Sequence, residues 1–315
     1  MTRVVFMGTP EFAVPSLEAL LDGGWDIAAV CTQPDRPSGR GHRLTACPVK
    51  EAALRHGLEV LQFERIRRQE GLDALRALRA DLFVTAAFGQ ILSQKILDIP
   101  PMGTVNVHAS LLPRYRGAAP IAWCIMEGER ETGVTTMLTD RGVDTGDMLL
   151  RRRTDILPGE TAGELSERLS RLGAALLAET LRRLEAGDCP REKQDEAQAS
   201  HFPMRDKSHG RIRWTQSALR ADCQVRGVTP WPGAWTVLPD GGILKIWKAR
   251  PVPGAGRPGE VLRADARAGM AVACAEGALE LVEVQGPGGR RMPAADYLRG
   301  HPLPAGLCLD GEASQ

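Results

Sequence analysis

The sequence predicts an α/β domain with a predominantly parallel sheet, followed by a small β-barrel domain. Three observations carry this prediction. Between residues 4 and 31, an apolar run, a stretch of helical periodicity and a second apolar run follow in the order of a βαβ unit. Two further apolar runs, at 81–88 and 104–108, read as buried strands. Beyond residue 210 the chain breaks into short segments separated by glycine and proline, as in small barrels.

The first βαβ unit has clear boundaries. A strand at 4–7 leads into Gly8-Thr9-Pro10, where Thr9 suits the N-cap of a helix and Pro10 its first turn. Gly23-Gly24 ends that helix before the strand at 27–31. No G-x-G-x-x-G motif follows the first strand, so the sequence does not predict a dinucleotide site.

The later elements follow from periodicity and turn residues. Helices are predicted at 49–56, 69–79, 118–126, 161–185 and 217–226, and strands at 58–60, 132–138, 148–150, 212–214, 234–238, 243–249, 260–263, 270–273 and 279–284. Thr161 and Glu164 fit a capping box. We therefore expect a first domain at 1–189, a polar linker at 190–208 and a second domain at 209–315.

Composition narrows the class of protein. Charged residues at 25% and hydrophobic residues at 43% are ordinary for a globular protein, and a net charge of +1 argues against a wholly cationic nucleic-acid coat. The seven cysteines include no C-x-x-C pair, so neither a metal site nor a disulfide framework is predicted. The N-terminus lacks a signal-peptide pattern and no apolar run reaches membrane-spanning length. We expect a cytoplasmic protein.

The strand at 104–108 carries the candidate chemistry. Asn106 and His108 share one face of it, because side chains two residues apart on a strand point the same way. An asparagine can donate to the oxyanion that forms when an acyl carbon is attacked, and a histidine can donate to it or carry a proton. The glycine-flanked turn at 142–147 could aim the Asp144 carboxylate at that imidazole. An isolated Asn-x-His is also common as a structural hydrogen-bonded pair, so the motif alone leaves both interpretations open.

The longer pattern around these residues resembles the folate-dependent formyltransferase family. The resemblance is carried by Asn-Val-His-Ala-Ser-Leu-Leu-Pro at 106–113, Arg-Gly at 116–117 and Asp-Thr-Gly-Asp at 144–147. Within that family, Arg-Tyr-Arg-Gly-Ala-Ala-Pro at 114–120 and Val-Asp-Thr-Gly-Asp-Met-Leu at 143–149 are most similar to the methionyl-tRNA formyltransferases. The resemblance extends from Gly8-Thr9-Pro10 to Thr-Pro-Trp-Pro at 229–232.

The resemblance implies a Rossmann-like catalytic domain followed by an OB-like barrel. It implies transfer of a formyl group from 10-formyltetrahydrofolate, without a metal, to the α-amino group of methionine on initiator tRNA. Asn106 and His108 would act on the oxyanion, and Asp144 would orient His108. The expected folate-binding residues are Phe88, Gly89, Ile91, Ser110, Leu111, Leu112 and Pro113. The family also implies a monomer. No association with membranes is expected, because no apolar run reaches membrane-spanning length.

The connection at 33–50 is long for a βα loop and is basic. Its composition fits a solvated surface loop, whereas the resemblance implies an insertion that reaches the acceptor stem of tRNA. Arg36, Arg40 and Arg43 would then contact the RNA, since arginine suits phosphates and base edges. A diffuse tRNA surface is expected further along the chain, at Lys207, Lys245 and Lys248.

Two other functions stay open. A sugar-nucleotide N-formyltransferase would share Asn106, His108 and Asp144, and a non-catalytic RNA-binding module on the same fold would bind tRNA without formyl-folate turnover. The basic segment 33–50 favours tRNA over a sugar, and the intact trio favours an enzyme over a binding module. A glycinamide ribonucleotide formyltransferase is disfavoured because such enzymes usually have one domain.

Overall fold

The computed structural model describes residues 1–38 and 43–310, and of Ser38 and Arg43 only the backbone. Two compact units can be recognised. One contains residues 1–120, 131–155 and 166–202, and the other contains residues 121–130, 156–165 and 203 onward. The units thus interleave along the chain, and residues 190–202 of the expected linker group with the first unit. Whether the ranges 1–189 and 209–315 fold as separate domains stays a prediction.

The first unit is built on a seven-stranded sheet with the order β10-β9-β7-β6-β1-β2-β5. The strands from β7 to β5 run parallel, whereas β9 and β10 add an antiparallel edge. The predominantly parallel sheet predicted from the sequence is therefore confirmed. Its strands are β1 (Arg3–Gly8), β2 (Asp26–Thr32), β5 (Val60–Gln62), β6 (Leu82–Ala86), β7 (Thr104–His108), β9 (Glu131–Leu138) and β10 (Met148–Asp155).

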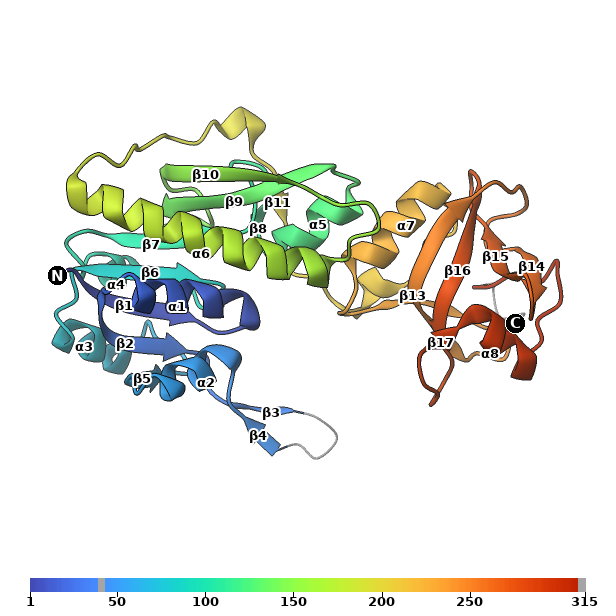
Figure 1. Cartoon of the computed structure of the whole chain (residues 1–315), viewed down its shortest axis with the longest axis horizontal. Helices are drawn as coiled ribbons and strands as arrows, with labels where there is room; N and C mark the ends of the chain where they lie inside the picture. The colour runs from blue at the N-terminus through green and yellow to red at the C-terminus, as the bar shows by residue number, and fades with distance from the viewer. Residues whose placement is uncertain (39–42, 311–315) are drawn as a thin grey trace. The chain divides into compact units, whose positions relative to one another are not determined.

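Helices cover both faces of this sheet. On one face, Phe83 of β6 is buried with residues of α3 (Gln69–Ala77) and α4 (Gln94–Leu97). On the other face α6 (Ala162–Ala186) packs through Gly173 against Val107 of β7, and Figure 1 shows α6 and α1 (Val14–Asp22) drawn in front of the strands. Side chains alternate along a strand, so Asn106 and His108 point away from α6, to the face that carries Phe83.

Local details differ from the expected elements. Thr9 does not cap a helix, because the short helix η1 (Glu11–Ala13) precedes α1 and the Thr9 hydroxyl instead donates to the backbone oxygen of Phe88 at 3.0 Å. Within the expected loop at 33–50, β3 (Arg36–Ser38) pairs with β4 (Arg43–Thr45) before α2 (Pro48–Arg55) begins. No strand forms at 212–214. The capping box at Thr161 is confirmed, with the Glu164 side chain accepting from its backbone N–H at 2.9 Å.

The second unit is an antiparallel sheet of six strands, in the order β12-β13-β16-β15-β14, with β17 paired to β16. Apolar side chains such as Leu244, Val272 and Leu281 form its core together with Val225 of α7 and Leu298 of α8. This confirms the small β domain expected at the C-terminal side. The elements are α7 (Ala218–Gly227), β12 (Ala234–Val237), β13 (Ile243–Val252), β14 (Val261–Asp265), β15 (Gly269–Ala273), β16 (Ala278–Gln285), β17 (Met292–Pro293) and α8 (Ala294–Gly300); α5 (Pro120–Met126) precedes them.

The last described residues touch both edge strands of that sheet. The N–H of Val261 in β14 donates to the backbone oxygen of Leu307 at 2.7 Å. Asp310 is hydrogen-bonded to Val237 of β12 in both directions, at 3.1 Å through its N–H and at 2.8 Å through its carboxylate. Residues 307–310 therefore connect β14 with β12. Across residues 1–38 and 43–310, no helix has the length and apolar character needed to span a bilayer.

Candidate active site

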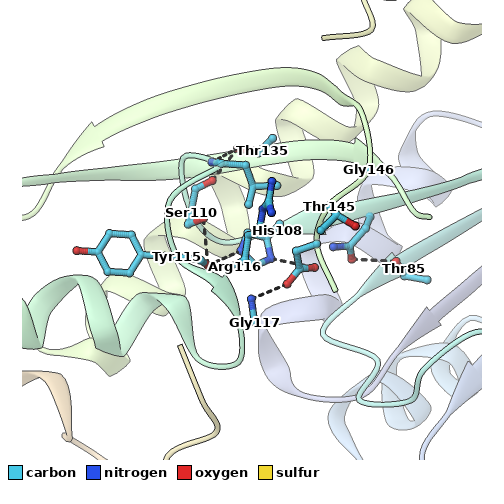
Figure 2. A network of polar contacts seen from close by, with 12 residues as sticks. Thr85, His108, Ser110, Tyr115, Arg116, Gly117, Thr135, Thr145 and Gly146 are labelled. Atoms are coloured by element: carbon cyan, nitrogen blue, oxygen red, sulfur yellow. Dashed lines mark hydrogen bonds and ion pairs between the residues drawn. The ribbon is translucent and has the colours of Figure 1, made fainter. Parts of the chain in front are cut away.

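Asn106 lies on β7 beside Thr85 of β6. The Thr85 hydroxyl donates to Oδ1 of Asn106 at 2.8 Å (Figure 2). Because this donor occupies the oxygen end of the amide, the Nδ2 end is directed to the other side as a hydrogen-bond donor. Sequence reasoning missed Thr85; the only signal was a hydroxyl in an otherwise apolar strand.

His108 is 6% exposed and its two ring nitrogens face different partners. Nε2 lies 2.9 Å from the backbone oxygen of Tyr115. A carbonyl only accepts, so Nε2 is the donor in that bond. Nδ1 lies 3.6 Å from Oδ1 of Asp144, which is ion-pair range but longer than a hydrogen bond. Nδ1 is therefore the nitrogen that can still bond a ligand atom.

Asp144 is held in the left-handed region, with a φ of 56°. Its Oδ2 accepts from the backbone N–H of Gly117 at 2.8 Å, while Oδ1 faces His108. The turn itself is tied by Asp140, whose Oδ1 accepts from Thr145 Oγ1 at 2.7 Å. The structure thus brings Asn106, His108 and Asp144 to one end of the sheet.

The segment 110–113 is held in place by hydrogen bonds to Arg114 and Thr135. Ser110 Oγ donates to the backbone oxygen of Arg114 at 2.7 Å. Thr135 Oγ1 donates to the backbone oxygen of Ser110 at 2.7 Å and accepts from the N–H of Leu112 at 3.1 Å. Ser110, Leu112 and Pro113 are buried, whereas Leu111 is half-buried. A ligand would therefore meet this segment mainly through Leu111.

The segment 88–91 is more open. Phe88 is buried in the core, and its backbone oxygen accepts from Thr9 Oγ1 and, at 3.3 Å, from Gln33 Nε2. Gly89 is exposed with a φ of 79°, and Ile91 is 71% exposed. A flat ligand can therefore approach Gly89 and Ile91, while Phe88 supports them from below.

The expected tRNA contacts are distributed over both units. Arg36 is exposed, with Nη2 3.7 Å from Glu64. Arg43 begins β4, and Arg40 lies outside the described residues. Lys207, Lys245 and Lys248 are exposed in the second unit, and Lys245 Nζ lies 5.9 Å from the ring centre of Trp247. In the described part of the chain, no three His, Cys, Asp or Glu side chains gather as metal ligands.

Comparison with known families explains this arrangement. Residues 2–181 match the sequence model of formyl transferase, and residues 205–302 match that of the formyl transferase C-terminal domain. The chain belongs to the formyl transferase family. The formyl transferase is 54% identical to the methionyl-tRNA formyltransferase of Solibacter usitatus over 303 residues, which are 96% of each chain. It is 50% identical to that of Geobacter sulfurreducens over 311 residues, which are 99% of this chain and 97% of the relative.

Solved structures show the same fold at lower identity. An N-formyltransferase from Helicobacter canadensis, in complex with folinic acid and dTDP-3-aminofucose, superposes with a TM-score of 0.66 at 18% identity, over 89% of this formyl transferase and 99% of that chain. A sugar 3N-formyl transferase in the presence of dTDP and 5-N-formyl-THF gives a TM-score of 0.65 at 17% identity, over 91% and 98% of the two chains.

Proposed function

We propose that this formyl transferase moves the formyl group of 10-formyltetrahydrofolate to the α-amino group of methionine on initiator tRNA, and so supports translation initiation. The observation that carries the proposal is the identity of 50–54% to proteins named methionyl-tRNA formyltransferase over at least 96% of both chains. The meeting of Asn106, His108 and Asp144 supports it chemically. A cytoplasmic location and a monomeric state belong to the same proposal.

The proposed reaction is an acyl transfer through a tetrahedral intermediate. The neutral amine of methionine attacks the formyl carbon, a new C–N bond forms and the formyl oxygen becomes an oxyanion. Asn106 donates to this oxygen through Nδ2, whose direction Thr85 sets. The bond to N10 of the folate then breaks, and the proton lost by the amine passes to that nitrogen. His108, with both ring nitrogens protonated, would donate to the oxyanion through Nδ1 and pass that proton on, and Asp144 would orient its ring.

The proposed folate contacts follow from exposure. Gly89 and Ile91 offer an open surface to the pterin, with Phe88 beneath them, and the segment 110–113 would contact the folate mainly through Leu111. Arg36, Arg40 and Arg43 would contact tRNA phosphates from the first unit, and Lys207, Lys245 and Lys248 from the second. Phosphate contacts make binding weaken as salt rises.

The test is formyl transfer from 10-formyltetrahydrofolate to three acceptors: initiator Met-tRNA, elongator Met-tRNA and an amino-sugar nucleotide. We expect selective formylation of the initiator. Formylation of the sugar nucleotide alone would preserve the chemistry and overturn the tRNA assignment. RNA binding without transfer to any acceptor would instead identify a binding module.

Replacing Thr85 with valine should lower kcat about fivefold, the equivalent of the ~1 kcal/mol of one neutral hydrogen bond, because the Asn106 amide loses the donor that orients it. Thr85→Ser is the matched control, since it keeps the hydroxyl. Asn106 is the only asparagine in the chain, so selective ¹⁵N-asparagine labelling gives a single side-chain amide signal. That signal should shift in Thr85→Val and stay in place in Thr85→Ser; the opposite pattern would contradict the role of Thr85.

A further inference from the structure

We infer that Gln194, in the segment 192–202, positions the carboxylate of Asp144 for its role beside His108. The segment lies between the two family matches, which end at residue 181 and begin again at residue 205. It also falls within the range that composition alone suggests to be a linker. The kinetic test of this inference rests on the proposed function. The geometry rests only on the contacts between Gln194 and its neighbours.

The segment 192–202 is bonded to both loops that hold the catalytic groups. Glu192 exchanges two backbone hydrogen bonds with Met148, at 2.8 and 2.9 Å, just after the Asp144 turn. Ser200 accepts from the N–H of Tyr115 through Oγ at 2.9 Å and from the N–H of Arg116 through its backbone oxygen at 2.8 Å. The short strand β11 (His201–Phe202) then runs parallel to β8 (Arg116–Gly117). The segment is therefore a fixed part of the first unit.

Gln194 joins the two loops through its side-chain amide. Nε2 donates to the backbone oxygens of Asp144 and Gly146, both at 2.8 Å, which uses both hydrogens of the NH₂ group. Oε1 accepts from Nε of Arg116 at 2.8 Å. The side-chain NH₂ group of Gln194 thus binds the Asp144 turn. Its side-chain oxygen binds Arg116, in the loop that follows His108. Figure 2 shows Arg116 and Gly146 in the same polar network as His108.

Arg116 is itself fixed in direction. It is 1% exposed, and its Nη1 and Nη2 donate to the two oxygens of Glu196 at 2.9 and 2.8 Å. Such a bidentate ion pair fixes both the position and the plane of the guanidinium group. The hydrogen bonds from Arg116 also lower the pKa of the Glu196 carboxyl. Because Glu196 binds both terminal nitrogens of Arg116, the remaining Nε–H is directed at the side-chain oxygen of Gln194.

Asp144 depends on such restraint because of its backbone. A φ of 56° is unfavourable for a residue with a Cβ and persists only where the surroundings hold it. Gly117 restrains the carboxylate, and Gln194 restrains the carbonyl of the same residue. Without Gln194 the turn can relax and carry Oδ1 away from His108. A displacement of about 1 Å at a catalytic group can cost on the order of a hundredfold in rate.

The test variant is Gln194→Glu. It keeps the length of the side chain and the acceptor for Arg116, but it replaces the donor with an oxygen that faces the carbonyls of Asp144 and Gly146. We expect kcat to fall roughly ten- to a hundredfold, with the KM for 10-formyltetrahydrofolate within about twofold of the wild type. The control is Gln198→Glu in the same segment, where the exposed amide donates to the Asp195 side chain at 2.8 Å. That variant should keep its kcat.

Two measurements separate positioning from a general structural role. In an Asp144→Asn background, Gln194→Glu should add little further loss, because the group that it positions is already gone. The ring-proton NMR signals of His108 should shift in Gln194→Glu and not in Gln198→Glu. If Gln194→Glu does not fold, Gln194→Met removes both donor and acceptor at similar length without adding charge.

An unchanged kcat, a change in KM alone, or fully additive losses with Asp144→Asn would overturn the inference. Absence of formyl transfer by the wild type would instead overturn the proposed function. In that case the His108 signals still decide the inference: unshifted signals in Gln194→Glu and Gln194→Met would overturn it, and shifted signals would support it.

Discussion

Asn106→Ala is expected to lower kcat about a hundredfold or more, equivalent to ~3 kcal/mol of lost transition-state stabilisation. The amide is the donor that the structure orients most directly, because Thr85 binds its oxygen end and leaves Nδ2 as the group that faces a ligand. The oxyanion exists only after attack, so its donor acts on kcat much more than on KM. The measurement is steady-state formyl transfer to initiator Met-tRNA.

The control for Asn106→Ala is the binding of folate and the melting temperature. Both should stay near wild type, since Asn106 is only half-buried and its removal leaves Thr85 within reach of the backbone oxygen of Val105. Near-normal turnover by a folded Asn106→Ala protein would show that another group stabilises the oxyanion.

His108→Gln is expected to lower kcat by a factor of roughly 10² to 10⁴, the range that a positioned acid–base group supplies. The glutamine amide can still donate to the backbone oxygen of Tyr115, as Nε2 does at 2.9 Å, so the loop after β7 keeps its anchor. What the variant lacks is a nitrogen that can take up and release a proton beside Asp144.

The matched control for His108→Gln is His56→Gln, which replaces an exposed imidazole at the end of α2 that is paired with Glu18 of α1 at 2.8 Å. This variant should retain full activity. If His56→Gln and His108→Gln lost activity equally, the effect would reflect general destabilisation. Comparable melting temperatures with a selective loss in His108→Gln would support the proton-transfer role.

Much of the fold could be read from local patterns. The apolar runs became β1, β2, β6 and β7, and the alternation of side chains on β7 placed Asn106 and His108 on one face. The glycine-flanked turn around Asp144 was also visible in the sequence. The structure shows why glycine is needed at residue 146: a Cβ there would lie 1.7 Å from the backbone oxygen of Leu138. These features depend on neighbouring residues, and neighbouring residues are what a sequence displays.

The remaining features depend on contacts between distant residues. Thr9 has the sequence context of a helix cap, but its hydroxyl donates to the backbone oxygen of Phe88, 79 positions along the chain. Thr85 acts on Asn106 only because β6 and β7 are parallel neighbours in register. Gln194 lies in a polar stretch without periodicity, and only the folded chain brings it to Asp144, 50 positions earlier. Composition cannot distinguish such a segment from a linker.

The connection that residues 307–310 make between β14 and β12 has a consequence for association. Strands at the rim of an open sheet present unpaired N–H and C=O groups, which are templates for strand addition from another chain. Here the backbone oxygen of Leu307 accepts from the N–H of Val261. Asp310 accepts from the N–H of Val237 through its carboxylate and donates its own N–H to the carbonyl of Val237. The end of the described chain thus shields these positions on both rims against intermolecular pairing. A chain that stopped before Leu307 would expose them and be prone to self-association.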